Sequence, residues 1–102
     1  MSNLKNEADI IHTLTGEIEV SLDESPTTGY RWVLLEAPKE VVPLGDTFVP
    51  SSQTPVPGGG GKKIFRFKIA TAGTFLLRFQ LKRSWETNPV QVRTVRLVVE
   101  TR

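Results

Sequence analysis

The 102-residue sequence contains no cysteine. This absence excludes disulfide bonds, thiolate catalysis and cysteine-based metal sites, so packing and strand pairing alone must hold the fold. Histidine occurs once, at His12 in the apolar segment 10–14, and no nucleophile motif accompanies it. We therefore expect no enzyme activity and no metal or other cofactor.

Long apolar runs are also lacking, because no stretch approaches the roughly 20 residues that a membrane-spanning helix needs. We expect no membrane partner. The first residues are polar and show no signal peptide, which makes the cytoplasm the default location; a chain trimmed of its leader would be periplasmic or secreted. We expect one domain over residues 1–102, with residues 1–9 a loosely ordered N-terminal extension.

A helical stripe is missing as well, and period-two alternation dominates instead. Residues 36–57 hold five of the seven prolines, which predicts at most short edge strands around Val41 and Phe48. Several short strands without helices predict an all-β, antiparallel β-sandwich. Trp32, on the third expected strand, resembles the core tryptophan of immunoglobulin-like domains. The alternating apolar positions are Ile18, Val20, Leu22, Tyr30, Trp32, Leu34, Phe65, Phe67, Ile69, Phe75, Leu77, Phe79, Leu81, Val95, Leu97 and Val99.

Charge is distributed unevenly along the chain. Up to Asp46 there are three basic and nine acidic residues, whereas from Thr47 onward there are ten basic and two acidic ones. Many of the later cations occupy outward strand positions. This pattern fits either a solvated sheet face or a surface for an acidic partner. No aromatic residues interleave the basic face to stack bases, so we expect no nucleic-acid partner.

Three connections between expected strands have unusual composition. The first combines a proline of fixed φ, two β-branched threonines and a permissive glycine, which predicts a loop that keeps one shape when nothing is bound. A glycine run forms the second, and it is either a flexible linker or bare backbone that another chain approaches closely. The third places a tryptophan beside an arginine, which favours an exposed binding anchor. The candidate site residues are Ser25, Pro26, Thr27, Thr28, Gly29 and Tyr30; Gly58, Gly59, Gly60 and Gly61; and Arg83, Ser84 and Trp85.

In this order, the three motifs resemble those of the chagasin family of cysteine peptidase inhibitors. That family carries an Asn-Pro-Thr-Thr-Gly-aromatic, a Gly-x-Gly-Gly and an Arg-Pro-Trp motif. Ser25 stands where the family usually has asparagine, and Ser84 where it usually has proline. Serine can still bond to nearby backbone in a turn, while the loss of the proline leaves the last loop less stiff.

The resemblance implies an immunoglobulin-like sandwich whose three loops cluster at one end and occlude the cleft of a papain-like cysteine peptidase. By that likeness, residues 26–29 enter the catalytic groove, the glycine loop follows the non-primed substrate sites, and Arg83 and Trp85 rest on the primed side. Inhibition would be reversible and non-covalent. The alternative is an adhesion or ligand-binding module that uses the same loops. Exposed edges in the proline-rich segment favour a monomer.

Overall fold

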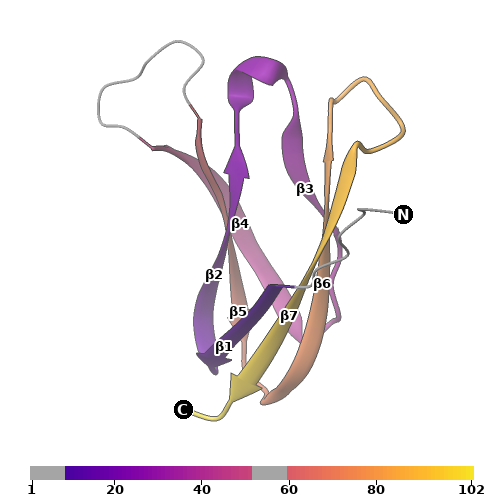
Figure 1. The fold of residues 1–102 in the computed structure, drawn as a ribbon. Coiled ribbons are helices and arrows are strands. Elements are labelled where there is room, and N and C mark those ends of the chain that lie inside the picture. The colour runs from indigo at the N-terminus through magenta and orange to yellow at the C-terminus, as the bar shows by residue number, and fades with distance from the viewer. Residues whose placement is uncertain (1–8, 52–59) are drawn as a thin grey trace.

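The structure, a computed structural model, describes residues 9–51 and 60–102. Within these ranges the chain folds into strands and one 3₁₀ turn, arranged as two facing sheets (Figure 1). One sheet has the strand order β1-β7-β6-β3 and the other β2-β5-β4. The predicted all-β sandwich is confirmed. The elements are β1 (Asp9–Leu14), β2 (Gly16–Glu24), η1 (Pro26–Thr28), β3 (Arg31–Glu36), β4 (Val41–Pro50), β5 (Gly61–Ile69), β6 (Gly73–Lys82) and β7 (Gln91–Glu100).

Strand β1 is the exception to antiparallel pairing. It pairs with β7 in parallel, with Asp9 opposite Val95, and then passes through Thr15 into β2 of the other sheet. The corner is held by a bond from the Thr15 amide to the Glu100 carbonyl at 2.9 Å. The sequence predicted a loosely ordered extension over residues 1–9, but Asp9 is the first residue of β1. Residues 1–8 lie outside the described residues.

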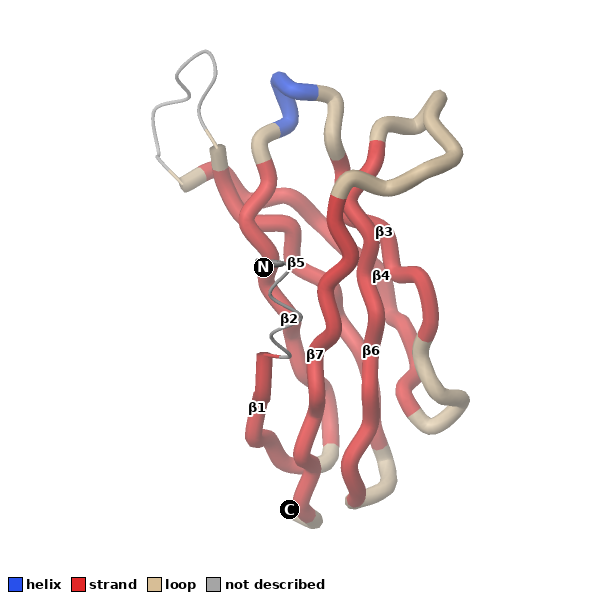
Figure 2. Tube along the Cα trace, turned by 45° about the vertical axis from the view of Figure 1, so that its right-hand side comes forward, coloured by secondary structure: helices blue, strands red, loops and turns tan. Residues whose placement is uncertain are grey.

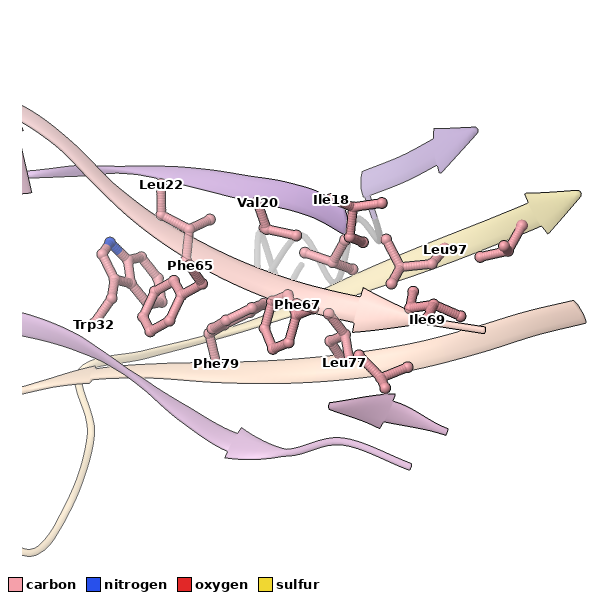
Figure 3. Close-up of a cluster of buried hydrophobic side chains, with 13 residues drawn as sticks. Ile18, Val20, Leu22, Trp32, Phe65, Phe67, Ile69, Leu77, Phe79 and Leu97 are labelled. Atoms are coloured by element: carbon pink, nitrogen blue, oxygen red, sulfur yellow. The ribbon is translucent and has the colours of Figure 1, made fainter. Parts of the chain in front are cut away.

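The core lies between the two sheets and follows the alternation read from the sequence. Ile18, Val20 and Leu22 of β2 point inward, while Glu17, Glu19 and Ser21 point to solvent. Phe79 is fully buried, and its ring centroid lies 4.8 Å from that of Phe65. Figure 3 shows these side chains interleaved between the strands. The inward set is Ile18, Val20, Leu22, Trp32, Val41, Phe65, Phe67, Ile69, Leu77, Phe79, Val95, Leu97 and Val99.

The uneven charge has a structural explanation on the outer face of the second sheet. Acidic β2 runs antiparallel to basic β5, so Glu17 lies opposite Lys68 and Asp23 opposite Lys62. Ion pairs form at 2.6 Å between Lys62 and Asp23 and at 2.8 Å between Arg66 and Glu17. Complementary strands on one sheet thus account for much of the charge separation along the chain, which supports the solvated-face interpretation there.

Strand β4 is longer than predicted. The prolines indicated at most short edge strands, yet Val41–Pro50 pairs along β5 from Val41 opposite Ile69 to Pro50 opposite Gly61. The physical reason is that β4 is an edge strand, where a proline without an N–H removes no ladder bond on the open side. A register shift between Pro43 and Gly45 absorbs the remaining irregularity, with Gly45 at φ +133°.

Candidate functional site

The registers place the described residues of the three predicted loops at one end of the sandwich. Gly61 pairs with both Glu24 and Pro50, so the end of β2 adjoins the β4–β5 connection. Arg31 pairs with Lys82, so the start of β3 adjoins the end of β6. Figures 1 and 2 both show η1 and the β6–β7 connection at this same end. The first loop crosses from one sheet to the other and is therefore not a hairpin.

The first loop is a single 3₁₀ turn closed by its own hydrogen bonds. The Ser25 carbonyl accepts from the Thr28 amide at 3.1 Å and from the Thr28 hydroxyl at 2.7 Å. The Pro26 carbonyl accepts from the Gly29 amide at 3.0 Å. Gly29 ends the turn at φ +81°, a conformation that strains residues with a Cβ. The same Thr28 hydroxyl accepts from the Tyr30 amide at 3.3 Å. The loop is therefore ordered without a partner, as its composition predicts.

Ser25 differs from the expectation drawn from the sequence. In this described turn its side chain makes no capping hydrogen bond, and its contribution comes from its backbone carbonyl. The Thr28 hydroxyl holds the turn instead. Thr28 thus has an internal bonding role in addition to its exposed position.

The base of the first loop is anchored by residues that the motifs did not identify. Glu24 is only 5% exposed, and its Oε2 accepts from the Trp32 amide at 2.8 Å. The Trp32 indole N–H donates to the Asp23 carbonyl at 2.8 Å. These bonds join the two sheets beneath the loop. The sequence offered one signal for this role: Glu24 is a charged residue at a position of β2 where the apolar–polar alternation predicts an inward, apolar side chain.

Asp23, at the loop end, has a shifted pKa. Its carboxylate accepts a hydrogen bond from the Lys62 ammonium, and this bond together with the positive charges of Lys62 and Arg93 lowers the pKa of Asp23 below its usual 3.8. Burial opposes the shift, but weakly, because the Asp23 side chain is 81% exposed.

The glycine run is described only in part, since Gly58 and Gly59 lie outside the described residues. Gly60 sits beside the first loop: a Cβ there would lie 3.3 Å from the Ser25 Oγ. Gly61 is buried, and a Cβ there would meet the Val49 carbonyl and lie 2.6 Å from Phe48 Cζ. At Gly61, close packing within the sheet by itself requires glycine, so the bare backbone there serves the fold.

The third loop exposes its tryptophan, as predicted. Trp85 is 72% exposed, and Ser84 is exposed beside it. The turn is held by a bond from the Glu86 amide to the Arg83 carbonyl at 3.0 Å and by one from the Lys82 ammonium to the Glu86 carbonyl at 3.0 Å.

The first and third loops contact each other directly. The Arg83 Nε donates to the Thr28 carbonyl at 3.3 Å, and the guanidinium carbon lies 4.3 Å from the Tyr30 ring centroid. A Cβ at Gly29 would lie 3.4 Å from Trp85 Cη2. The described parts of all three motifs therefore form one continuous end surface, with Ser25 next to Gly60 and Gly29 next to Trp85.

Within the described ranges the structure shows no group of three or more acidic, histidine or cysteine side chains that could hold a metal ion. His12 lies exposed on β1, outside the loop end. In the same ranges, no helix has the length and apolarity needed to cross a membrane.

Comparisons with solved structures show chains of the same fold. A cysteine protease inhibitor from Entamoeba histolytica, EhICP2, is 24% identical, with a TM-score of 0.71 over 94% of this chain and 90% of that one. Amebosin is 26% identical, with a TM-score of 0.65 over 95% and 91%. PbICP-C, solved in complex with falcipain-2, is 18% identical, with a TM-score of 0.57 over 100% and 96%. Comparison with curated proteins gave no match.

The model of one protein family also matches this sequence. It is described as chagasin family peptidase inhibitor I42, and it matches residues 13–99. That range contains all three loops and every strand from β2 to β6. The resemblance read from the motifs is confirmed, and the family is one of inhibitors, not enzymes: this chain belongs to the chagasin family of peptidase inhibitors.

Proposed function

We propose that this chain is a reversible, tight-binding inhibitor of papain-like cysteine peptidases that occludes the active-site cleft with its three loops. Family membership supports peptidase inhibition, and EhICP2 is described as a cysteine protease inhibitor. The observation that carries the proposal is the closed Ser25–Tyr30 turn at the exposed tip of the loop end.

The geometry of this turn explains how it can fill a cleft without being cut. A thiolate attacks a substrate carbonyl that is accessible and aligned, which an extended peptide offers. In this turn the carbonyls of Ser25 and Pro26 accept hydrogen bonds from within the loop, and the Thr28 carbonyl accepts one from Arg83 of the third loop. Moving any of these carbonyls into line with the thiolate would break one of these hydrogen bonds.

The first and third loops are held by hydrogen bonds before any partner binds, which supports tight affinity. Little conformational entropy is lost when a preformed loop is immobilised. Trp85 offers a large apolar surface with few torsions, as is typical of residues that dominate interfaces. An interface of about 800 Å² per partner, common for protease–inhibitor pairs, is compatible with nanomolar or tighter binding.

The direct test is titration of papain with the purified chain while hydrolysis of a small peptide substrate is followed. We expect stoichiometric loss of activity and an inhibitor that stays uncut, as judged by mass spectrometry. Full activity at micromolar excess of the chain, or steady cleavage within residues 25–30, would refute the proposal.

Thr27 offers a sharper test than Thr28, because Thr27 is exposed while the Thr28 hydroxyl also holds the turn. We expect Thr27→Arg to raise the inhibition constant by at least about tenfold, or roughly 1.4 kcal/mol, with an unchanged Tm. The matched control is Thr71→Arg, an exposed threonine between β5 and β6 at the opposite end. Equal effects of the two variants would contradict a binding site at the loop end.

A further inference from the structure

Arg83 has contacts that a simple peptidase-binding role does not require. Its guanidinium carbon lies over two aromatic rings, 4.3 Å from the Tyr30 centroid and 5.7 Å from the Trp85 centroid. Its Nε donates to the Thr28 carbonyl at 3.3 Å. In addition, the Glu86 Oε2 lies 3.9 Å from the Arg83 Nη1. The side chain is only 36% exposed, so most of its surface is covered by its own chain.

The neighbouring tryptophan contrasts with this arrangement. Trp85 keeps 72% of its surface exposed, although its Cη2 would lie 3.4 Å from a Cβ at Gly29. A partner at the loop end can therefore cover much of Trp85 but little of Arg83. Arg83 and Trp85 therefore differ in how much of their surface remains free for a peptidase.

We propose that Arg83 is a positioning residue, a clamp that fixes the first loop against the third and sets the orientation of Trp85. Its importance for inhibition rests on the function proposed above. The clamp itself is a property of the free chain. This interpretation replaces the implied role of Arg83 as a contact on the primed side.

The composition of the two loops explains why a clamp is needed. Ser84 stands where the family usually has a proline, so the φ angle before Trp85 is not fixed by a ring. Gly29, at φ +81°, closes the first loop with the most permissive residue. The Arg83 side chain bonds or stacks on residues that flank both positions. A guanidinium stacked on aromatic rings and bonded to a carbonyl restricts both loops before binding, and so lowers the entropy lost on binding.

A double-mutant cycle separates a clamp from a direct contact. Arg83→Met keeps an unbranched side chain but removes the charge and the donor, and Tyr30→Leu removes one stacking partner. We expect Arg83→Met to raise the papain inhibition constant about 10- to 100-fold in the native background. In the Tyr30→Leu background, the same change should have an effect at least about threefold smaller. An identical factor in both backgrounds would mean that Arg83 acts on the peptidase directly, and would overturn the clamp.

NMR of the free chain tests the clamp without any peptidase. A Cβ at Gly29 would lie 3.4 Å from Trp85 Cη2, so Gly29 is near enough to the indole for its ring current to shift the Gly29 proton resonances. We expect Arg83→Met to move the Gly29 resonances toward random-coil values. The control is Arg78→Met on β6, the strand that precedes Arg83. Arg78 is an exposed arginine paired with Glu36 at 2.9 Å, and its replacement should leave both the Gly29 resonances and the inhibition constant unchanged.

The two experiments distinguish failure of the clamp from failure of the proposed function. If the native chain does not inhibit papain but the Gly29 resonances move in Arg83→Met, the clamp stands and the proposed function fails. If the native chain inhibits papain and the Gly29 resonances stay in place, the clamp is wrong and the proposed function stands.

Discussion

At the scale of single residues, Trp32 and Glu24 perform the cross-linking that a cysteine-free chain cannot achieve with a disulfide. The Trp32 amide donates to the Glu24 carboxylate, and its indole donates to the Asp23 carbonyl, both at 2.8 Å. Each bond joins β3 of one sheet to the end of β2 of the other. A buried polar group with a partner adds stability, while one that loses its partner is costly.

Replacing Glu24 tests this link. In Glu24→Ala the buried Trp32 amide loses its acceptor, so we expect the free energy of unfolding to fall by about 1–3 kcal/mol. Glu24→Gln keeps an oxygen that can accept the same bond, so its loss should be less than half as large. Urea denaturation of the two variants measures both values. Equal losses would indicate that the negative charge, and not the acceptor, is what the fold uses.

At the scale of elements, β2 and β5 are matched by charge as well as by hydrophobic pattern. Their outward positions place acids opposite bases along the ladder, and the Lys62–Asp23 pair stands where this ladder meets the loops. Both side chains are more than half exposed, at 53% and 81%, so solvent screens much of their attraction.

The lowered pKa of Asp23 predicts a pH-dependent contribution to stability. Because Lys62 stabilises the ionised carboxyl in the folded state, the contribution is fully present above the usual pKa of 3.8 and is lost as pH falls through the lower, folded-state pKa. We expect Asp23→Asn to lower the free energy of unfolding by less than about 1 kcal/mol at pH 7. The difference in free energy of unfolding between the variant and the native chain should shrink as pH falls below 3.8, as followed by urea denaturation. If the difference in free energy of unfolding between the two chains did not change with pH, the effect of the substitution would not come from ionisation of Asp23.

At the scale of the whole molecule, the core and the loop end are separate parts. Phe79 is fully buried, with Phe65 and Phe67 rings at 4.8 and 6.5 Å, whereas Trp85 is 72% exposed at the tip. The sandwich provides a rigid base, and the loops present the proposed binding surface.

This separation predicts opposite phenotypes for two aromatic truncations. Phe79→Ala should lower the free energy of unfolding by about 3–5 kcal/mol, which corresponds to a Tm lower by roughly 15 °C or more. Trp85→Ala should leave Tm nearly unchanged and weaken papain inhibition. Calorimetry and inhibition assays on both variants check the pair. A large fall in Tm for Trp85→Ala would place that residue in the core instead.

The sequence alone determined the parts of this protein that depend on local periodicity and on motif chemistry. Period-two alternation identified the inward residues of β2, β5, β6 and β7, because a strand must bury one face. The composition of residues 25–30 indicated an ordered loop, because its proline, threonines and glycine each restrict or permit particular backbone angles. The exposed state of Trp85 followed from its place in a turn.

Only the tertiary structure decided the features that depend on contacts between distant segments. The proline count predicted edge strands in this segment, but the ten-residue length of β4 depends on its pairing with β5 from Val41 to Pro50, which no local count reveals. Likewise, the packing of Gly61 against Val49 requires the register of β4 on β5, and the bond from Arg83 to Thr28 spans 55 positions. Such contacts depend on how the two sheets and their connections are assembled. A pattern along the chain could identify Arg83 as a candidate site residue, but it could not show that Arg83 bonds to Thr28 of the first loop.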